Sequence, residues 1–361
     1  MRRIKVLLVG PYPPPYGGIA VQIYEWQRHL EKLGTFECSI LNIGESRAAN
    51  LNNCVSVHGY LDFLRKVHGF VRQGYLIHLV TNGHNLKSWL CSFACALVGA
   101  RNSRRTVLVF GSGLMPEYIN RAGFLPRLLI RSTVKLGGRL ICRNEQMRGA
   151  LIRMGAEPTR ISILSGFLSI GPISQEPLPQ TIQAFLDTHL PVLGATVSVP
   201  DSGVLYPEYG IELIMATLKE LRVTCPRIGA VIIGAGPQVR SQIVGLDGVA
   251  CHVIFTGSLP HDVVLGLMKQ LTIFLRPTYF DGDSLSVREA LALSVPVVAS
   301  DTDYRPDGVI LFRKGDTPDL VEKLRYTLEH LEEVTAGVRK LAPSRNTDRV
   351  LRLYRDLVEV A

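Results

Sequence analysis

The residues with the clearest chemical potential lie in one short stretch, DGDSLSVRE, in which two aspartates, a glycine and a serine precede a predicted helix. Ser284 is a favourable N-cap for a helix that starts near Leu285, and Glu289 lies one turn inside that helix. Backbone N–H groups at a helix start, with the helix dipole behind them, attract phosphate oxygens. Gly282 permits close approach of the backbone, and a carboxylate one turn in can accept hydrogen bonds from ribose hydroxyls. The pattern predicts a site for a nucleotide diphosphate.

The stretch lies between two predicted strands, within residues 276–301, RPTYFDGDSLSVREALALSVPVVASD. This segment resembles the E-x7-E region of the retaining, nucleotide-sugar-dependent GT-B glycosyltransferases known as group 1 or family 4. In that family the second carboxylate binds the nucleotide ribose and the first lies near the transferred sugar. Glu289 and Asp281 match these positions, the latter as Asp rather than Glu, and the strand at 296–301 is also typical. The resemblance implies a catalytic role for Asp281. It implies donor binding by Arg276, Gly282, Asp283, Ser284, Leu285 and Glu289.

A second loop with paired glycines, GPYPPPYGG, follows the first predicted strand. Its prolines exclude a regular element, and Gly17 and Gly18 come just before a predicted amphipathic helix over residues 19–33. The first strand of the family likewise leads into a Pro-containing loop with paired glycines at a helix start. The resemblance implies that Gly17 and Gly18 let the backbone approach the donor diphosphate or the acceptor. Without it, paired glycines before a helix fit a simple turn.

Polar residues after two further strands are candidates for an acceptor side. His84 and Asn85 follow one predicted strand, where a role in ligand binding and a purely structural role are both open. Gly111 and Ser112 follow the next, in a stretch, GSGLMPE, that resembles the H-x-G acceptor segment of the family. The family usually has a histidine where this chain has Gly111. The departure removes a group expected near the transferred sugar.

A second departure concerns the cations expected around the diphosphate. The family commonly carries an Arg and a Lys after the first strand of its C-terminal domain, in a G-R-x-x-x-x-K-G pattern. Here Tyr209 and Gly210 occupy the K-G position, and no Lys or Arg lies between residues 194 and 215. Two phosphates would lack their usual cationic clamp. Arg276, Arg288 or a basic side chain of the N-terminal domain could replace it.

The elements that must position these residues alternate between short apolar strands and amphipathic helices, which predicts an α/β fold with parallel sheets. The resemblance implies a GT-B architecture, with two Rossmann-like doubly wound domains facing across a cleft, and a length of 361 residues also favours two domains. A Pro-, Ser- and Gln-rich stretch marks the boundary. We expect an N-terminal acceptor-binding domain at 1–170, a linker at 171–184, a C-terminal donor-binding domain at 185–345 and a terminal helix at 346–361 that crosses back to the first domain.

Apolar periodicity also predicts the individual elements. The predicted strands cover residues 4–9, 76–80, 106–110, 139–143, 161–164, 192–199, 228–233, 252–256, 273–275, 296–299 and 309–312. The predicted helices, besides 19–33, cover residues 211–222, 262–271, 285–293, 320–341 and 348–360. The apolar run at 89–100 is too short to span a bilayer and indicates a buried helix.

Charge is distributed unevenly along the chain. Residues 1–170 carry 22 Lys and Arg against 8 Asp and Glu, a net charge of +14, whereas the remainder carries a net charge of −5. A basic N-terminal half suggests an anionic partner, although a solvated basic face is an alternative. Residues 125–140 space Arg127, Arg131, Lys135 and Arg139 at intervals of four among Leu and Ile. This pattern favours a basic helix in peripheral contact with a membrane, with an ordinary solvated helix as the alternative.

The cysteines and the absent motifs indicate the cellular compartment and the kinds of ligand that are excluded. The seven cysteines are scattered and form no C-x-x-C pair, which favours reduced thiols in a cytoplasmic protein, here with membrane contact at the inner face of the cell membrane. No reader motif or aromatic stacking pattern supports nucleic-acid binding. The D-x-D spacing of Asp281 and Asp283 falls inside the motif already described, so we expect no metal site and no cofactor.

The resemblance implies transfer of a sugar from a UDP- or GDP-linked donor to a hydroxyl, with retention of configuration. The acceptor expected by analogy is a glycan or lipid-linked glycan in surface polysaccharide biosynthesis. Two alternatives remain open. One is a nucleotide-sugar epimerase of GT-B fold, and the other is a degenerate, non-catalytic GT-B protein that binds a glycan or a partner transferase, which the two departures would favour.

Overall fold

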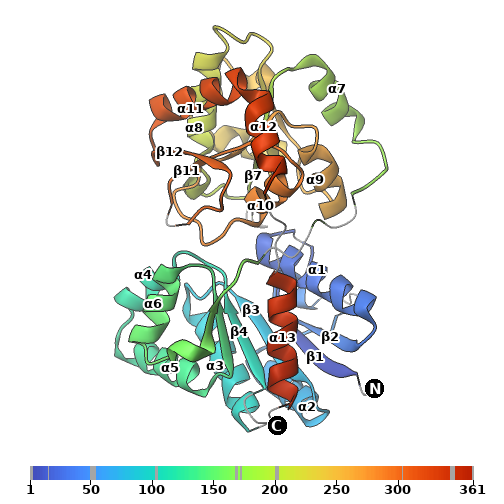
Figure 1. Ribbon diagram of the computed structural model, residues 1–361, viewed down its shortest axis with the longest axis vertical. Coiled ribbons are helices and arrows are strands. Elements are labelled where there is room, and N and C mark those ends of the chain that lie inside the picture. The colour runs from blue at the N-terminus through green and yellow to red at the C-terminus, as the bar shows by residue number, and fades with distance from the viewer. Residues whose placement is uncertain are drawn as a thin grey trace. The chain divides into compact units, whose positions relative to one another are not determined.

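A computed structural model describes residues 3–14, 16–48, 54–101, 105–166, 170, 173–199, 203–302, 304–341 and 346–359. The chain divides into two compact units. Unit 1 comprises Met1–Leu168 and Ser344–Ala361, and unit 2 comprises Ser169–Pro343. Each unit is a parallel sheet with helices on both faces (Figure 1).

The sheet of unit 1 has six described strands in the order β2-β1-β3-β4-β5-β6, all paired in parallel. Its apolar, β-branched sequences suit strands that are buried on both faces. Its strands are β1 (Ile4–Gly10), β2 (Phe36–Asn42), β3 (Leu76–Thr81), β4 (Thr106–Phe110), β5 (Arg139–Cys142) and β6 (Ile161–Ile163).

Two layers of helices cover this sheet. One apolar core joins the sheet to α3 and its neighbours, and a second joins it to α1 and α13 through Trp26, Leu351 and Tyr354. Figure 1 shows α13, in dark red, among the blue elements of unit 1 although it ends the chain. The helices are α1 (Gly18–Leu33), α2 (Tyr60–Arg72), α3 (Leu86–Ala100), α4 (Met115–Arg121), α5 (Phe124–Leu136), α6 (Glu145–Arg153) and α13 (Asn346–Glu359), with short 3₁₀ turns η1 (Glu45–Ala48) and η2 (Pro158–Arg160).

The sheet of unit 2 also has six described parallel strands, in the order β12-β11-β10-β7-β8-β9. This is the doubly wound order of dinucleotide-binding folds, in which the chain reverses direction across the sheet between the first and fourth strands. Its strands are β7 (Val192–Thr196), β8 (Gly229–Ile233), β9 (Val253–Phe255), β10 (Ile273–Arg276), β11 (Val297–Ser300) and β12 (Val309–Phe312).

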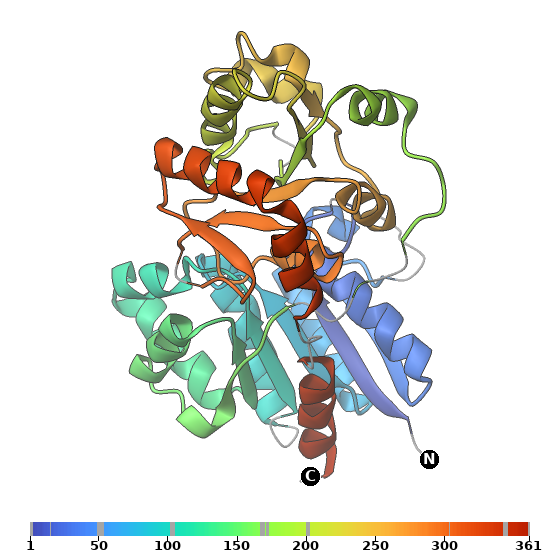
Figure 2. The same ribbon diagram turned by 45° about the horizontal axis from the view of Figure 1, so that its top comes forward.

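Helices again lie on both faces of the sheet of unit 2, with α8 and α11 in one apolar core and α7, α9, α10 and α12 in the other. The helix predicted at 320–341 is two helices, and Figure 2 shows the bend between them. The helices are α7 (Gln180–Thr188), α8 (Ile211–Leu221), α9 (His261–Met268), α10 (Leu285–Ala292), α11 (Thr317–Glu329) and α12 (Leu331–Arg339), with 3₁₀ turns η3 (Pro207–Tyr209), η4 (Pro237–Gln242) and η5 (Ala250–His252).

The stretch 171–184, predicted as a linker, falls within unit 2. Of its described residues, Leu178 and Ile182 are buried in the core of that unit, and α7 already begins at Gln180. The linker prediction was wrong because the stretch is rich in Pro, Ser and Gln and its two buried apolar residues did not form a recognisable pattern. The last helix, α13, is part of unit 1.

In doubly wound sheets, ligands bind beyond the carboxyl ends of the strands, where the strand order reverses. In unit 2 this point lies between the ends of β7 and β10, Thr196 and Arg276. In unit 1 it lies between β1 and β3, which lead into Gly17 and His84 respectively. The sheet topology therefore brings the predicted site residues of each unit to the edge where ligands of such folds bind.

Candidate functional site

The start of α10 is anchored to the end of β7 by side-chain hydroxyls. Ser284 is the N-cap, as predicted, and its buried Oγ accepts a hydrogen bond from Val287 N at 3.4 Å. Ser286 accepts a hydrogen bond from Thr196 Oγ1 at 2.9 Å, and its Oγ lies 3.1 Å from that of Ser284. The helix thus begins at Leu285, and its positive end lies at the strand-reversal point of unit 2.

Glu289, one turn into α10, is held by a histidine from another helix. His261, the first residue of α9, places Nε2 2.7 Å from Glu289 Oε1, and both residues are buried. A buried carboxylate needs such a partner, and the contact fixes its orientation. His261 was not predicted as a site residue, because it lies 28 residues from Glu289 and directly before a separate predicted helix, 262–271.

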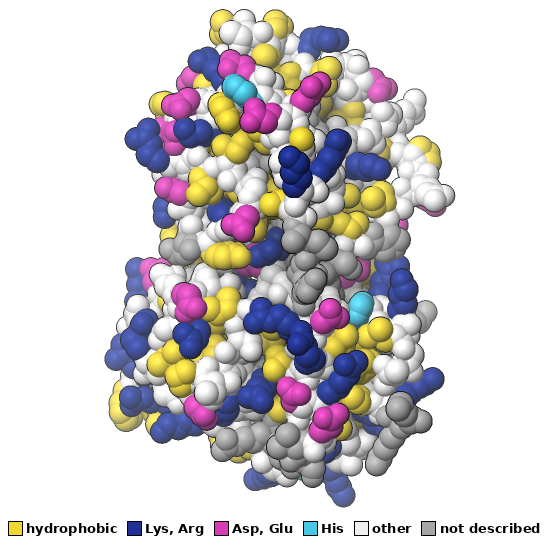
Figure 3. Space-filling view, in the orientation of Figure 1, with side chains coloured by type: hydrophobic (Ala, Val, Ile, Leu, Met, Phe, Trp, Pro, Cys, Tyr) yellow, Lys and Arg dark blue, Asp and Glu magenta, His cyan; other side chains and the backbone are white. Residues whose placement is uncertain are grey.

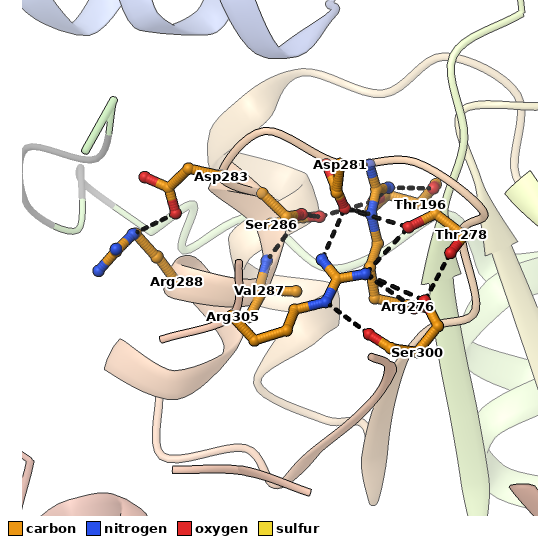
Figure 4. Close-up of polar contacts among 11 residues, drawn as sticks. Thr196, Arg276, Thr278, Asp281, Asp283, Ser286, Val287, Arg288, Ser300 and Arg305 are labelled. Carbon is orange, nitrogen blue, oxygen red and sulfur yellow. Dashed lines mark hydrogen bonds and ion pairs between the residues drawn. The ribbon is translucent and has the colours of Figure 1, made fainter. Parts of the chain in front are cut away.

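Asp281 lies in a cluster with two arginines (Figure 4). Its Oδ2 accepts hydrogen bonds from Arg276 Nε at 2.9 Å, from Arg305 Nη1 at 2.7 Å and from Thr278 Oγ1 at 3.2 Å. Its Oδ1 lies 3.5 Å from Arg276 Nη2. Burial would raise the pKa of Asp281, but the two guanidiniums outweigh it and hold the pKa at about 2. The carboxylate is therefore ionised and firmly oriented.

Arg305 connects the strand ends beside the cluster. It donates from Nε to the carbonyl of Ser300 and from Nη2 to Thr278 Oγ1, at 3.0 Å each, in addition to its bond to Asp281. The residue was not predicted, since it lies 24 residues from Asp281, beyond β11. Arg305 follows a predicted strand and directly precedes Pro306, and this is the local sign that it lies in a loop with a restricted backbone.

Arg276 brings a cation to the Tyr209–Gly210 turn, where the family resemblance would place a lysine. Its Nη1 donates to the carbonyl of Thr196 at 3.0 Å, and its guanidinium lies over the ring of Tyr209, 5.7 Å from the centroid. Gly210 has φ of +63°, and a Cβ there would meet the carbonyl oxygen of Pro277 at 2.1 Å, so glycine is required. The Tyr209–Gly210 turn thus packs directly on the loop that follows Arg276.

A separate ion pair involves Asp283, the side chain of which is 1% exposed. Its Oδ1 accepts from Arg288 Nε at 2.7 Å, and Arg288 Nη2 donates to Tyr304 Oη at 2.9 Å. Burial alone would lower the pKa of Arg288, but the Asp283 carboxylate outweighs it and the net shift is upward. The other carboxylate oxygen, Oδ2, is buried without a hydrogen-bond partner.

In unit 1, Gly17 and Gly18 form the start of α1. Gly17 is the N-cap, in an extended conformation and with no side chain to cap the helix, and Gly18 is the first helical residue. A Cβ on Gly18 would meet nothing within 4 Å. The helix start therefore presents backbone with open space beside it, and its first turn has no acidic residue.

The predicted acceptor-side residues are brought together at the ends of β3 and β4. His84 Nδ1 lies 2.9 Å from Ser112 Oγ, which also accepts a hydrogen bond from Leu114 N at 3.2 Å. Asn85 is the N-cap of α3 and accepts from Ser88 N at 2.9 Å. Gly111 follows β4 directly, and a Cβ there would have only ordinary contacts. Asn85 therefore has a structural role, and His84 is held in a defined position.

A buried arginine at the end of β5 was not predicted as a site residue. Arg143 donates to the carbonyl of Leu164 at 2.8 Å and to Gln22 Oε1, on α1, at 2.9 Å. It places a positive charge one turn along α1 from the paired glycines. Among the described residues, no group of three or more His, Cys, Asp or Glu side chains is arranged to hold a metal ion.

Comparisons with known proteins agree with this geometry. Residues 202–330 match the family model of glycosyl transferases group 1. Residues 202–330 form a group 1 glycosyltransferase domain. A GDP-mannose-dependent α-(1-6)-phosphatidylinositol monomannoside mannosyltransferase of Mycolicibacterium smegmatis is 32% identical over 124 residues, which cover 32% of either chain. The sulfoquinovosyl transferase SQD2 of Arabidopsis thaliana is 30% identical over 142 residues, 37% of this chain and 27% of that protein.

The matches to these relatives cover only part of each of them. A phosphatidylinositol N-acetylglucosaminyltransferase gpi3 subunit of Schizosaccharomyces pombe is 21% identical over 68% of this chain, and the match covers 52% of the subunit. The chain thus spans between about a quarter and a half of the length of these relatives.

Solved structures extend the likeness to both units. Anabaena HepE in complex with UDP aligns over 99% of each chain with a TM-score of 0.69 and 15% identity. Sucrose-phosphate synthase of Thermosynechococcus elongatus aligns over 99% of this chain and 100% of its own, with a TM-score of 0.71 and 15% identity. The group 1 domain is therefore the C-terminal half of a GT-B fold, as predicted.

Proposed function

We propose that the protein is a glycosyltransferase that moves a sugar from a UDP- or GDP-linked donor to a hydroxyl of a glycan or lipid-linked acceptor. The observation that carries this proposal is the assembly at the strand-reversal point of unit 2. There Thr196, at the end of β7, contacts both Ser286 in the first turn of α10 and the guanidinium of Arg276 at the end of β10, and Glu289 lies one turn into the same helix. The group 1 domain match supports the same class of reaction.

Each group has a defined task in this proposal. Glu289, oriented by His261, accepts hydrogen bonds from the ribose hydroxyls. The backbone at residues 282–285 and the positive end of α10 bind the diphosphate. Arg276 replaces the absent lysine as a cation, and Tyr209 and the Thr196 carbonyl keep it in place.

The chemistry follows from these tasks. The bond between the anomeric carbon and the diphosphate oxygen breaks, and the acceptor oxygen bonds to the same carbon. The hydroxyl proton of the acceptor passes to the departing phosphate oxygen. The negative charge that develops on the diphosphate is stabilised by the dipole of α10 and by Arg276, which are already in place before reaction. Departure and attack on one face of the sugar give the retained configuration that we propose.

Calorimetric titration with UDP and with GDP tests the donor site directly. We expect one of the two nucleotides to bind in the micromolar range, and its sugar conjugate to be consumed only when an acceptor glycan is added. Consumption without acceptor, with isomerised sugar as product, would instead indicate an epimerase. Failure of both nucleotides to bind at millimolar concentration would contradict the proposal and favour a non-catalytic GT-B protein.

We further propose that unit 1 contacts an anionic membrane surface through α5, in a cytoplasmic protein that serves surface polysaccharide synthesis. None of the described helices is long and apolar enough to cross a bilayer. At the start of α5, Phe124 is 81% exposed, and Leu125 and Leu128 are exposed beside it. Arg127 and Arg131 are also exposed on this helix, and Figure 3 shows many other Lys and Arg side chains over unit 1.

The predicted basic stretch at 125–140 needs one correction. The helix ends at Leu136 because Gly137 and Gly138 follow it, and Arg139 begins β5. The charge of Arg139 is therefore not on the helix. Sedimentation with phosphatidylcholine vesicles, with and without phosphatidylglycerol, tests the contact. We expect binding only to the anionic vesicles and its loss in the F124S/L125S double variant, whereas equal binding of that variant would contradict the proposal.

A further inference from the structure

Two aspartates flank Gly282 in the loop before α10, and their carboxylates have different surroundings. Asp281 Oδ2 already accepts three hydrogen bonds, and the whole group lies between two guanidiniums. Its arginine partners join the ends of β7, β10 and β11 through the carbonyls of Thr196 and Ser300. The principal contacts of Asp281 are thus internal, and they hold the loop in place.

Asp283 has the opposite arrangement. Arg288 binds one of its oxygens, and Tyr304 in turn accepts a hydrogen bond from that arginine, so the carboxylate is held at one side only. The second oxygen, Oδ2, is buried and has no partner. Figure 4 shows this oxygen on the side of the carboxylate away from Arg288. An ionised acceptor that is buried and unpartnered carries a desolvation cost, which a donor group on a ligand would remove.

The place of Asp283 in the chain defines which part of a ligand would reach it. It directly precedes Ser284, the N-cap of the helix proposed to bind the diphosphate. A group bonded to that diphosphate therefore comes within reach of Asp283. Because Arg288 already balances the charge of the carboxylate, an uncharged hydroxyl suits Oδ2 better than a second cation does.

We propose that Asp283 accepts a hydrogen bond from a hydroxyl of the transferred sugar, while Asp281 serves to position the loop. This inference rests on the proposed function and deepens it. It moves the sugar-recognising carboxylate two residues along the motif, from the position that the resemblance implies. Arg288 is then a positioning residue, which holds Asp283 by Oδ1 and leaves Oδ2 without a protein partner.

The Asp283→Asn variant tests this assignment with little change in shape. The amide oxygen can keep the bond from Arg288, and the amide nitrogen then replaces the unpartnered acceptor with a donor. We would measure by calorimetry the dissociation constants of UDP, GDP, UDP-glucose, UDP-N-acetylglucosamine and GDP-mannose. For the nucleotide-sugar that binds the wild-type protein best, we expect D283N to weaken affinity about tenfold. For the matching nucleoside diphosphate, we expect a change of less than about twofold.

Matched variants give the result its meaning. Asp307→Asn, at an exposed aspartate outside the site, should leave both affinities unchanged. Asp281→Asn should lower the affinity for nucleotide and nucleotide-sugar alike, because it disturbs the loop that both use. The inference is overturned if D283N binds the nucleotide-sugar as the wild type does, or if D281N alone loses affinity selectively for the sugar conjugate.

Two further observations keep failure of the inference distinct from failure of the proposed function. Binding of UDP or GDP by the wild type establishes the donor site before any variant is compared, so its absence refutes the function rather than the role of Asp283. Nucleotide binding by D283N shows that the variant is folded. If D283N does not fold, Asp283→Ser, which also lacks the carboxylate, must show the same selective loss, and an unchanged ratio of affinities would refute the inference.

Discussion

The two sheet edges that carry the predicted sites are organised by different forces. At the edge of unit 2, buried ion pairs hold the loop before α10, with Asp281 between two arginines and Asp283 against Arg288. At the edge of unit 1, the contacts of His84, Ser112 and Asn85 join imidazole, hydroxyl and amide groups to one another and to the backbone. At the edge of unit 2 several charged side chains are paired and oriented before any ligand arrives. At the edge of unit 1 the buried Arg143 is instead held by the carbonyl of Leu164 and the amide of Gln22.

The net charge of a half of the chain does not show where its charged side chains are concentrated. The N-terminal 170 residues carry a net charge of +14 and the remainder a net charge of −5, so composition alone would assign an anionic ligand to unit 1. At the level of side chains, Arg276, Arg305 and Arg288 concentrate guanidiniums around the helix start of unit 2. A short-range diphosphate site depends on such placed charges, whereas a diffuse basic surface suits an extended anionic partner.

The largest expected effect comes from replacing Asp281, which lies in the loop before α10 and pairs with two arginines. Asp281→Asn removes the counterion of two partly buried arginines, and an uncompensated buried charge typically costs about 3–5 kcal/mol. We therefore expect the free energy of unfolding, measured by urea denaturation, to fall by about 3 kcal/mol. The exposed Asp307→Asn variant serves as the control. A loss below about 1 kcal/mol would mean that the arginines find other partners and that the ion pairs do not organise this edge.

The same cluster predicts a dependence of stability on acid pH. The folded pKa of Asp281 is about 2, against an ordinary value of 3.8, so the unfolded chain takes up the proton more readily. The contribution, about 2 kcal/mol, is fully present above the unfolded pKa and is lost as pH falls from about 4 towards 2. Denaturation of wild type and D281N at pH 2 to 6 measures it as a difference. If both proteins lost stability in parallel across this range, Asp281 would not be the source of the pH dependence and the prediction would be wrong.

The parts of this edge that are contiguous in sequence could be predicted from it, and the parts that are distant could not. Ser284 and Leu285 were identified as the helix start because a cap and an apolar period are local signals. Arg305 and His261 were missed because their partners lie 24 and 28 residues away, and the pairing depends on how the sheet brings strand ends together. The unpartnered oxygen of Asp283 is likewise a property of packing alone.

The fold shows the same division. Strands with continuous apolar runs, such as β1 and β4, were predicted almost to the residue. The edge strand β2 was missed because its sequence, FECSILN, mixes polar residues with apolar ones and is only partly buried. The helix predicted at 320–341 is interrupted at His330, where no Gly or Pro marks the break. Unit 2 also begins before residue 185, since Leu178 and Ile182 contribute to its core.

A smaller effect is expected at the ribose carboxylate, where the charged edge meets the ligand. Glu289→Gln keeps an oxygen for His261 but turns an amide donor towards the ribose hydroxyls. Loss of charge-assisted hydrogen bonds worth about 2 kcal/mol should weaken binding of UDP or GDP about 30-fold in calorimetry. Inorganic pyrophosphate, which has no ribose, should bind wild type and variant equally. Equal weakening for pyrophosphate would show that Glu289 acts through the helix rather than through the ribose.

The smallest expected effect lies at the contact between His84 and Ser112 in unit 1. Ser112→Ala removes the hydroxyl that contacts His84 and that accepts from Leu114 N, at a cost of about 1 kcal/mol in the free energy of unfolding. Because this edge contains none of the groups proposed to bind nucleotide, the affinity for UDP or GDP should be unchanged. Sugar transfer to an acceptor glycan should fall, since His84 loses its contact with the Ser112 hydroxyl. If S112A weakened nucleotide binding as strongly as E289Q does, the two edges would not have the separate donor and acceptor tasks that their contacts indicate.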